Sequence, residues 1–178
     1  KNNGNGTGIR AEAGSEGIAA VFKGNVQVLS ASTGAILTEI GEGLDYAEGF
    51  DVAVDTDIEA GSVLVIDPDN PGKLAVSTRP YDTRVAGIVA GAKSLGSGVR
   101  LGAGQFDHDV ALAGRVYCNV DASLQDIEPG DLLTTSDLPG FAMKVTDSAR
   151  AQGAILGKAM EGLNKGRRGQ ILVLVTLQ

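Results

Sequence analysis

Glycine residues divide the first 34 residues of the chain into apolar pieces too short to build a core of their own. The glycines stand at positions 4, 6, 8, 14, 17, 24 and 34, and the pieces between them are residues 8–11, 17–22 and 26–29. Short strands of this kind bury their few apolar side chains only against further strands. A flexible linker would explain the glycines but not the close succession of Val21, Phe22 and Val26. We therefore expect this segment to pack against the same segment of other copies.

The composition predicts an all-β protein with one sizeable core or two small ones. The 178 residues are 43% apolar and include 26 Gly and five Pro. Turn signals recur about every 8 to 12 residues, which is typical of short strands in a sandwich or barrel. A chain of this length and apolar content buries enough surface to fold, so extensive disorder is excluded.

The charge balance and the hydropathy exclude two classes of partner. The chain has 15 basic and 22 acidic residues, a net charge of −7, so a nucleic acid would be repelled. No apolar run approaches the roughly 20 residues that cross a bilayer, so we expect no membrane insertion. Because the chain starts at Lys1 without a Met or a signal-peptide core, we expect it to be the C-terminal piece of a longer protein.

The part after residue 40 reads as a duplicated domain, with half one at about 50–91 and half two at about 117–160. Residues 58–64 correspond to 127–133, and Pro71-Gly72 corresponds to Pro139-Gly140. Further on, Arg84, Gly87 and Gly91 correspond to Arg150, Gly153 and Gly157. Each half is predicted to consist of strands joined by Gly and Pro-Gly turns. Two such halves packed face to face would form a small barrel or sandwich.

Three further segments have a clear local signature. Residues 110–120 alternate between apolar and other side chains, which predicts a half-buried strand with Cys118 in the core rather than a reactive thiol. Residues 170–177 are apolar enough to form a closing strand buried on both faces. Residues 147–152 predict one short helical turn capped by Asp147 or Ser148.

The segment that joins the two regions carries the most specific motif. It reads Gly-Leu-Asp-Tyr-Ala-Glu-Gly-Phe-Asp over residues 43–51. This motif resembles the C-terminal intramolecular-chaperone modules of phage tail fibres and appendages, some of which cut themselves. Residues 84–91, 110–116 and 130–136 are similar to later elements of that module, and the Gly-rich start is similar to the fibre stem that precedes it.

The resemblance implies a homotrimer at the end of a fibre, outside a cell or on a virion surface. Residues 1–40 would be the intertwining β-stem, and residues 41–178 the duplicated β-domain that sets three chains in register. A domain that sets the register is needed because a register error of one residue turns every inward side chain of the stem outward. Trimerising first also holds the stem segments at high effective concentration.

Two alternatives for function remain open. In self-cutting relatives a carboxylate pair of this Asp-x-x-Glu spacing looks to be involved in scission, which carries over to Asp45 and Glu48 as candidate residues of an autoprotease. The other reading of these two residues is a structural turn with a trimer-interface hydrogen bond. The second alternative is a tip that binds a cell-surface glycan or envelope protein, with Tyr81, Phe106 and His108 as weak candidates.

Metal and cofactor chemistry find little support in the sequence. One Cys and one His cannot build the usual zinc sets. The acidic turn at residues 67–72 lacks the spacing of a calcium loop, and the glycines near residue 96 lack the Lys-Ser/Thr of a phosphate loop. We therefore expect no metal and no cofactor.

Overall fold

The computed structural model describes residues 9–15, 17–54 and 58–176. The protein is predominantly β, with 43% strand, 4% helix and a small barrel-like sheet, so the predicted all-β class is confirmed. The strands are β1 (Val26–Leu29), β2 (Ile36–Ile40), β3 (Asp45–Phe50), β4 (Val63–Ile66), β5 (Leu74–Val76), β6 (Val85–Val89), β7 (Val99–Leu101), β8 (His108–Asp121), β9 (Leu132–Thr135), β10 (Ala142–Lys144), β11 (Ile155–Ala159) and β12 (Arg168–Thr176), with a 3-10 turn η1 (Ala92–Ser94) and one helix α1 (Ser148–Ala151).

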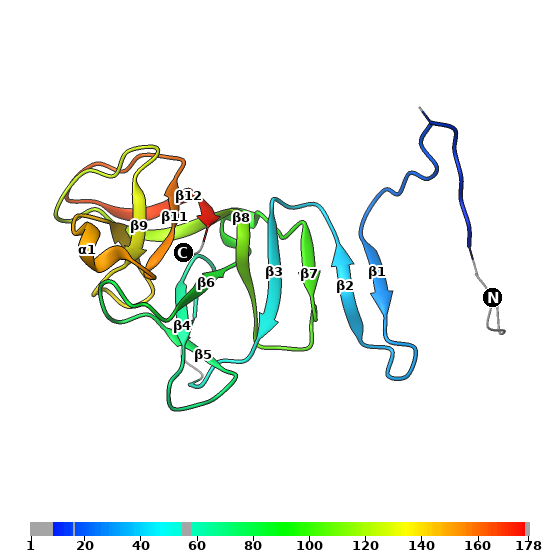
Figure 1. Ribbon diagram of the computed structural model, residues 1–178, viewed down its shortest axis with the longest axis horizontal. Coiled ribbons are helices and arrows are strands. Elements are labelled where there is room, and N and C mark those ends of the chain that lie inside the picture. Colours follow the sequence, from blue (N-terminus) through cyan, green and yellow to red (C-terminus); the bar gives the residue numbers. More distant parts are fainter. Residues whose placement is uncertain (1–8, 16, 55–57, 177–178) are drawn as a thin grey trace.

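One sheet runs the length of the molecule (Figure 1). Its strand order is β1-β2-β7-β3-β8-β10-β9-β11-β12, and β12 also pairs with β8, so the last five strands close on themselves. β6 and β4 branch from β8, with β5 at the edge of β4. We call the part from β3 onward the barrel, and the β1–β2 pair the stem hairpin.

The long strand β8 is the centre of the barrel, as the alternation over residues 110–120 predicts. Its first half pairs with β3 and β6, and its second half pairs with β12 along nine residue pairs. Val116, Cys118 and Val120 are completely buried in the main core cluster. Burial also raises the pKa of the Cys118 thiol, so the prediction of a core cysteine is confirmed.

The barrel contains two three-stranded units with the same strand order, β5-β4-β6 and β10-β9-β11. The central leucines have partners at the same register positions: Leu64 faces Val76 and Gly87, and Leu133 faces Lys144 and Gly157. The tight turns before them are also alike, because Gly61 donates to the Val89 carbonyl at 2.8 Å and Gly130 donates to the Ala159 carbonyl at 2.8 Å. Both units therefore use one hydrogen-bonding scheme.

This register corrects the expected correspondence of the third strands. Gly87, and not Gly91, occupies the register position of Gly157. The comparison of the two halves matched the glycines in order. It missed that the connection before β11, which contains α1, is longer than the corresponding connection before β6. The helical turn itself is confirmed, and the Asp147 side chain accepts hydrogen bonds from the amides of Ala149 and Arg150. That the two units arose by internal duplication stays a prediction.

The closing strand differs from its expectation in burial. β12 is buried at Ile171, Val173 and Val175, whereas Leu174 between them is exposed. It therefore buries one face fully and the other only in part, because Gln170 and Leu172 on the second face are half-buried while Leu174 is exposed. The last expected residue of this strand, Leu177, lies outside the described part of the chain.

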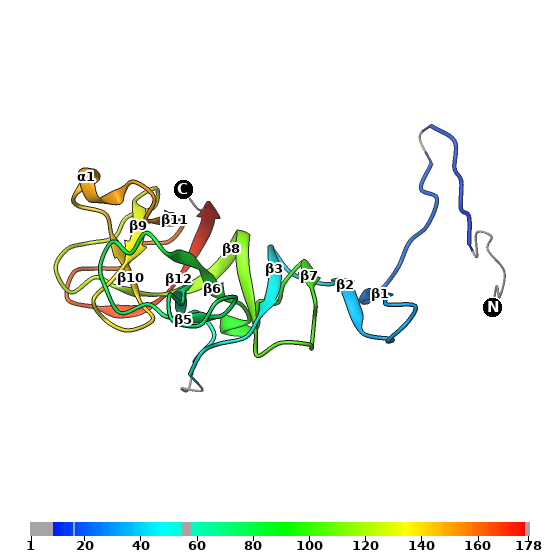
Figure 2. The ribbon, with the colours of Figure 1, turned by 60° about the horizontal axis from the view of Figure 1, so that its bottom comes forward.

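The stem hairpin extends the sheet away from the barrel. β2 pairs with β7 over three residue pairs, and β1 lies beyond β2 as the outermost strand of the sheet (Figures 1 and 2). Among the described residues 9–15 and 17–25, none lies in a strand, so the short strands expected there are absent from this single copy. The boundary that we expect at residue 40 stays a prediction, since the sheet continues across it.

The described part of the stem leaves its apolar side chains exposed. The exposed fraction is 79% for Ile18, 82% for Val21 and 72% for Phe22. In the stem hairpin, Val28, Leu29, Leu37 and Ile40 are 50–55% exposed. The described residues 9–15 and 17–23 are therefore exposed to solvent and are not packed against the barrel of their own chain.

The helices of the described residues are too short and too polar to cross a bilayer.

Candidate functional site

The predicted motif at residues 43–51 lies where the stem hairpin meets the barrel, and Asp45 begins β3 there. Asp45 pairs with Gly114 of β8, and its own carbonyl accepts a hydrogen bond from the Gly98 amide at 2.9 Å. Gly114 has a φ of +96°, and a β-carbon there would lie 2.6 Å from the Leu44 carbonyl oxygen. Only glycine fits this approach. Asp45 is therefore held by backbone from two neighbouring segments.

The Asp45 carboxyl is buried without a hydrogen-bond partner. Its exposed fraction is 5%, and neither carboxyl oxygen has a partner among the described residues. The hydroxyl of nearby Ser97 is likewise buried and unpaired. Burial is the largest cause of a raised Asp45 pKa; Ser97 opposes the shift, and the negative charge of Asp109 adds to it. This carboxyl therefore takes up a proton more readily than an exposed aspartate.

A second polar cluster beside Asp45 joins the stem hairpin to the barrel. Glu39 of β2 and Arg100 of β7 are direct cross-strand partners, and they form an ion pair. Arg100 also donates to Asp109 of β8 at 3.0 Å. Glu39 is only 4% exposed, and its carboxylate also accepts hydrogen bonds from Asn25 and Gln27 of the hairpin side.

The charges of this cluster support one another. The Arg100 guanidinium is the largest cause that lowers the pKa of Glu39, and Glu39 in turn raises the pKa of Arg100. A buried carboxylate is stable only when it is paired. We name Glu39, Arg100 and Asp109 the junction triad, because they connect the neighbouring strands β2 and β7 with β8, which lies on the far side of β3.

The other candidate of the autoprotease reading, Glu48, does not meet Asp45 in this chain. β3 buries Asp45, Ala47 and Gly49 on one side and leaves Tyr46, Glu48 and Phe50 more exposed on the other. Side chains three residues apart on a strand point to opposite faces. The two carboxylates therefore do not form a pair within one copy, and the acidic neighbour of Asp45 is Asp109 instead.

The three weak binding candidates lie at two separate places. Phe106 packs over Gly49 and Gly102, where a β-carbon would approach its ring to 2.5 and 2.7 Å. His108 begins β8 and pairs with Phe50. Tyr81 instead hydrogen-bonds with Thr146 and Asp147. Phe106 and His108 are thus neighbours, whereas Tyr81 belongs to another surface.

The acidic turn at residues 67–72 is held by its own hydrogen bonds. Asp67 accepts from the amides of Asp69 and Asn70 and from the Asn70 side chain, which lowers the pKa of Asp67. In the described ranges no group of three or more His, Cys, Asp or Glu side chains lies close enough to hold a metal ion.

Sequence reasoning missed the junction triad and the Asp82–Arg84 ion pair. Glu39 and Arg100 are 61 residues apart, and no local pattern connects them. Asp82 and Arg84 did carry a signal, because an aspartate in a turn commonly accepts the amide of the residue two positions later, and Asp82 accepts the Arg84 amide at 3.0 Å. Their side chains form two hydrogen bonds of 2.9 and 2.6 Å.

Comparison of the chain with protein-family models, with curated proteins and with solved structures finds no match.

Proposed function

We propose that this chain is the trimerising end of a fibre, in which the barrel sets the register of three stems. The observation that carries the proposal is the exposure of the stem's apolar residues in a single copy. Val21 and Phe22 lie almost fully in solvent, and β1 leaves one edge of the sheet unpaired within the described residues. Exposed apolar side chains beside a free strand edge are what a strand from another copy would cover.

The junction triad supports the registering role. It fastens β2 to β7 through a buried cross-strand pair, so the stem leaves the barrel in one defined register. A buried polar group fixes register in some assemblies, and here a slipped arrangement would leave the buried Glu39 carboxylate without its arginine. The number three and the location outside a cell or on a virion come from the resemblance to tail-fibre modules.

We also propose that the two units of the barrel arose by internal duplication. The shared strand order and the matched partners of Leu64 and Leu133 support this origin. The two units share the main core cluster, to which one contributes Val63 and Ile88 and the other Leu133 and Leu156.

Sedimentation equilibrium at micromolar concentration tests the proposed function. We expect a mass of three chains for the unchanged protein, where one chain is 18.1 kDa. Phe22→Asp should weaken the association, while Lys23→Asp at the neighbouring exposed position serves as the matched control. A monomer at these concentrations would contradict the proposal.

Self-cleavage is a second candidate, favoured by the buried, unpartnered carboxyl of Asp45. A neutral carboxyl can protonate a neighbouring peptide group, and the Leu44 carbonyl beside it is held by the Arg115 amide at 2.9 Å. A denaturing gel of the unchanged chain beside Asp45→Asn and Glu48→Gln variants tests this candidate. Cleavage of the unchanged chain that Asp45→Asn abolishes would support it, whereas an intact unchanged chain would refute it.

A further inference from the structure

A hollow at the α1 end of the barrel combines two arginines with an aromatic ring. It lies on the side away from the stem hairpin, since α1 and the N-terminal segment are at opposite ends of the molecule (Figure 1). We call it the Arg79–Arg150 hollow, and its lining residues are Arg79, Pro80, Tyr81, Asp82, Thr83 and Arg150. The proposed fibre function assigns no role to it, and the inference below does not depend on the oligomeric state.

The wall of the hollow is held rigidly from both sides. The Tyr81 amide donates to the Thr135 carbonyl at 3.2 Å, and the Asp82 amide donates to the Thr135 hydroxyl at 2.8 Å. The Tyr81 hydroxyl accepts hydrogen bonds from the amides of Thr146 and Asp147 at 2.9 and 3.0 Å. These bonds keep Tyr81 at a φ of +59°, in the left-handed region that a tyrosine rarely adopts. The wall is thus fixed before any ligand arrives.

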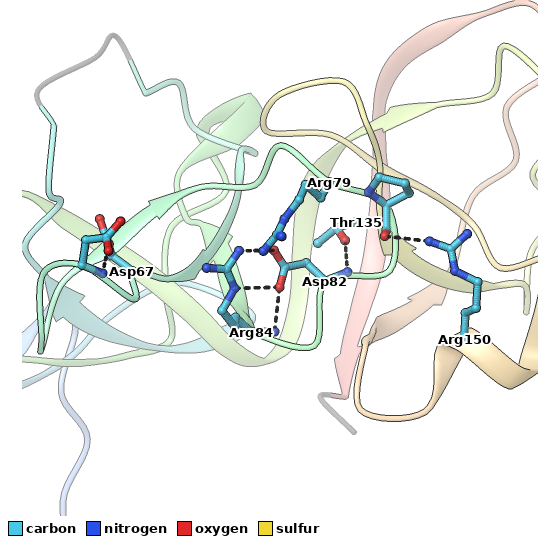
Figure 3. A network of polar contacts seen from close by, with 8 residues as sticks. Asp67, Arg79, Asp82, Arg84, Thr135 and Arg150 are labelled. Carbon is cyan, nitrogen blue, oxygen red and sulfur yellow. Dashed lines mark hydrogen bonds and ion pairs between the residues drawn. The ribbon is translucent and has the colours of Figure 1, made fainter.

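The buried carboxylate of the hollow is already neutralised by another residue. Asp82 has a 4% exposed side chain, and Arg84 donates to both of its oxygens, as Figure 3 shows. Mainly because of Arg84, the pKa of Asp82 falls to about 2. Arg79 adds only a long contact of 3.4 Å, and its side chain is 65% exposed. Asp82 therefore neutralises the positive charge of Arg79 only weakly.

Arg150 supplies a second positive charge that no carboxylate of the described residues neutralises by an ion pair. Its guanidinium donates to the Pro80 carbonyl at 3.3 Å, the bond drawn from Arg150 in Figure 3. The guanidinium also lies over the Tyr81 ring, 4.5 Å from the ring centre. Stacking on Tyr81 fixes the plane of the guanidinium without consuming its remaining donors. In a chain with a net charge of −7, two such cations in one hollow are exceptional.

We propose that the Arg79–Arg150 hollow binds an acidic saccharide, with sugar carboxylates held by the two guanidiniums. The planar fork of an arginine matches a carboxylate, with which it forms two parallel hydrogen bonds. The two arginines line the same hollow from separate elements, so a ligand that carries carboxylates along its length can reach both guanidiniums. Thr83 and Pro80 also line the hollow and are a polar and an apolar residue of the kinds that a sugar ring contacts.

Isothermal titration with a galacturonic acid tetramer tests the proposal on the whole chain. We expect binding that weakens as salt is added, because the contacts are ionic. A neutral glucose tetramer of equal length should not bind. Arg79→Gln and Arg150→Gln should each lower the affinity about tenfold or more. Arg167→Gln, at an exposed arginine outside the hollow, should leave the affinity unchanged.

Amide chemical shifts of the unchanged protein provide a test that does not rely on the variants being folded. Addition of the galacturonic acid tetramer should shift the amide signals of residues 79, 81–83 and 149–151 and leave those of the stem hairpin unchanged. Absence of binding, shifts elsewhere, or an affinity in Arg79→Gln and Arg150→Gln equal to that of the unchanged protein would overturn the proposal. Inorganic phosphate that binds as tightly as the tetramer would also overturn it, because the site would then recognise a bare anion rather than a sugar acid.

Discussion

Replacing Arg100 with Met is expected to loosen the stem hairpin while the barrel stays folded. Methionine keeps the apolar stem of the side chain but removes the guanidinium that pairs with Glu39 and Asp109. The buried Glu39 carboxylate then keeps only its contacts with Asn25 and Gln27. Opening the hairpin to water relieves this carboxylate, so the local opening equilibrium shifts toward the open state.

The size of this effect follows from the exposure of the two partners. A hydrogen bond to a charged group contributes about 1.5–3 kcal/mol. Arg100 is 32% exposed, so water already screens part of the interaction, and a value of about 2 kcal/mol is appropriate. This corresponds to a roughly 30-fold larger open population.

Amide hydrogen exchange measures the opening directly. Protection of the β2 amides should fall about 30-fold in Arg100→Met, whereas amides of β8 and β12 that lie in the barrel should not change. Arg115→Met is the matched control, because Arg115 is exposed on β8 and forms no ion pair with a described residue. Adding Glu39→Gln to Arg100→Met should restore part of the protection, since no buried charge remains. Unchanged exchange of β2 in Arg100→Met would refute the role of the junction triad.

Three further predictions concern single residues. Asp45→Asn should stabilise the protein by about 1–3 kcal/mol at neutral pH. Folding raises the Asp45 pKa, so ionisation of this carboxyl opposes folding; the gain should be absent below the unfolded pKa of about 3.9 and should grow as the pH rises to the folded pKa. Urea unfolding at several pH values measures this gain, and a pH-independent difference would contradict the reasoning. Gly114→Ala should lower the free energy of unfolding by about 2 kcal/mol or more in the same assay, because its β-carbon would meet the Leu44 carbonyl. Gly104→Ala, which has open space around it, should lower this free energy less. Equal losses in the two variants would contradict the close approach at Gly114. Cys118 should not react with a thiol reagent until the chain unfolds, and reaction of the native protein at the rate of a free thiol would show that the core opens readily.

Much of the local structure could be predicted because it depends on neighbouring residues. The alternation around Cys118 indicated β8, and Asp147 indicated the cap of α1. The Gly and Pro-Gly turns indicated the strand ends in both units. Each of these signals lies within a few residues of the element that it specifies.

The candidate site could be predicted only in part, because its residues meet through the register of distant strands. The motif placed Asp45 at the junction, but its neighbours Ser97 and Asp109 come from other segments. Asp45 and Glu48 point to opposite faces of β3 within one copy for a reason visible in the sequence, since a three-residue spacing suits one face of a helix and not one face of a strand. Registers between distant strands depend on the whole core, which no local pattern encodes.

A nitroxide spin label on the stem tests most directly whether sister stems lie together in register. Ala19→Cys offers an exposed labelling position, and the buried Cys118 should remain unlabelled. Strands in a sheet lie about 5 Å apart, so identical positions of three in-register stems lie within roughly 10 Å of one another. We predict strong dipolar broadening of the spectrum, which disappears when the labelled chain is unfolded, mixed with an excess of unlabelled chain and refolded. A spectrum without broadening in the undiluted sample would contradict the account.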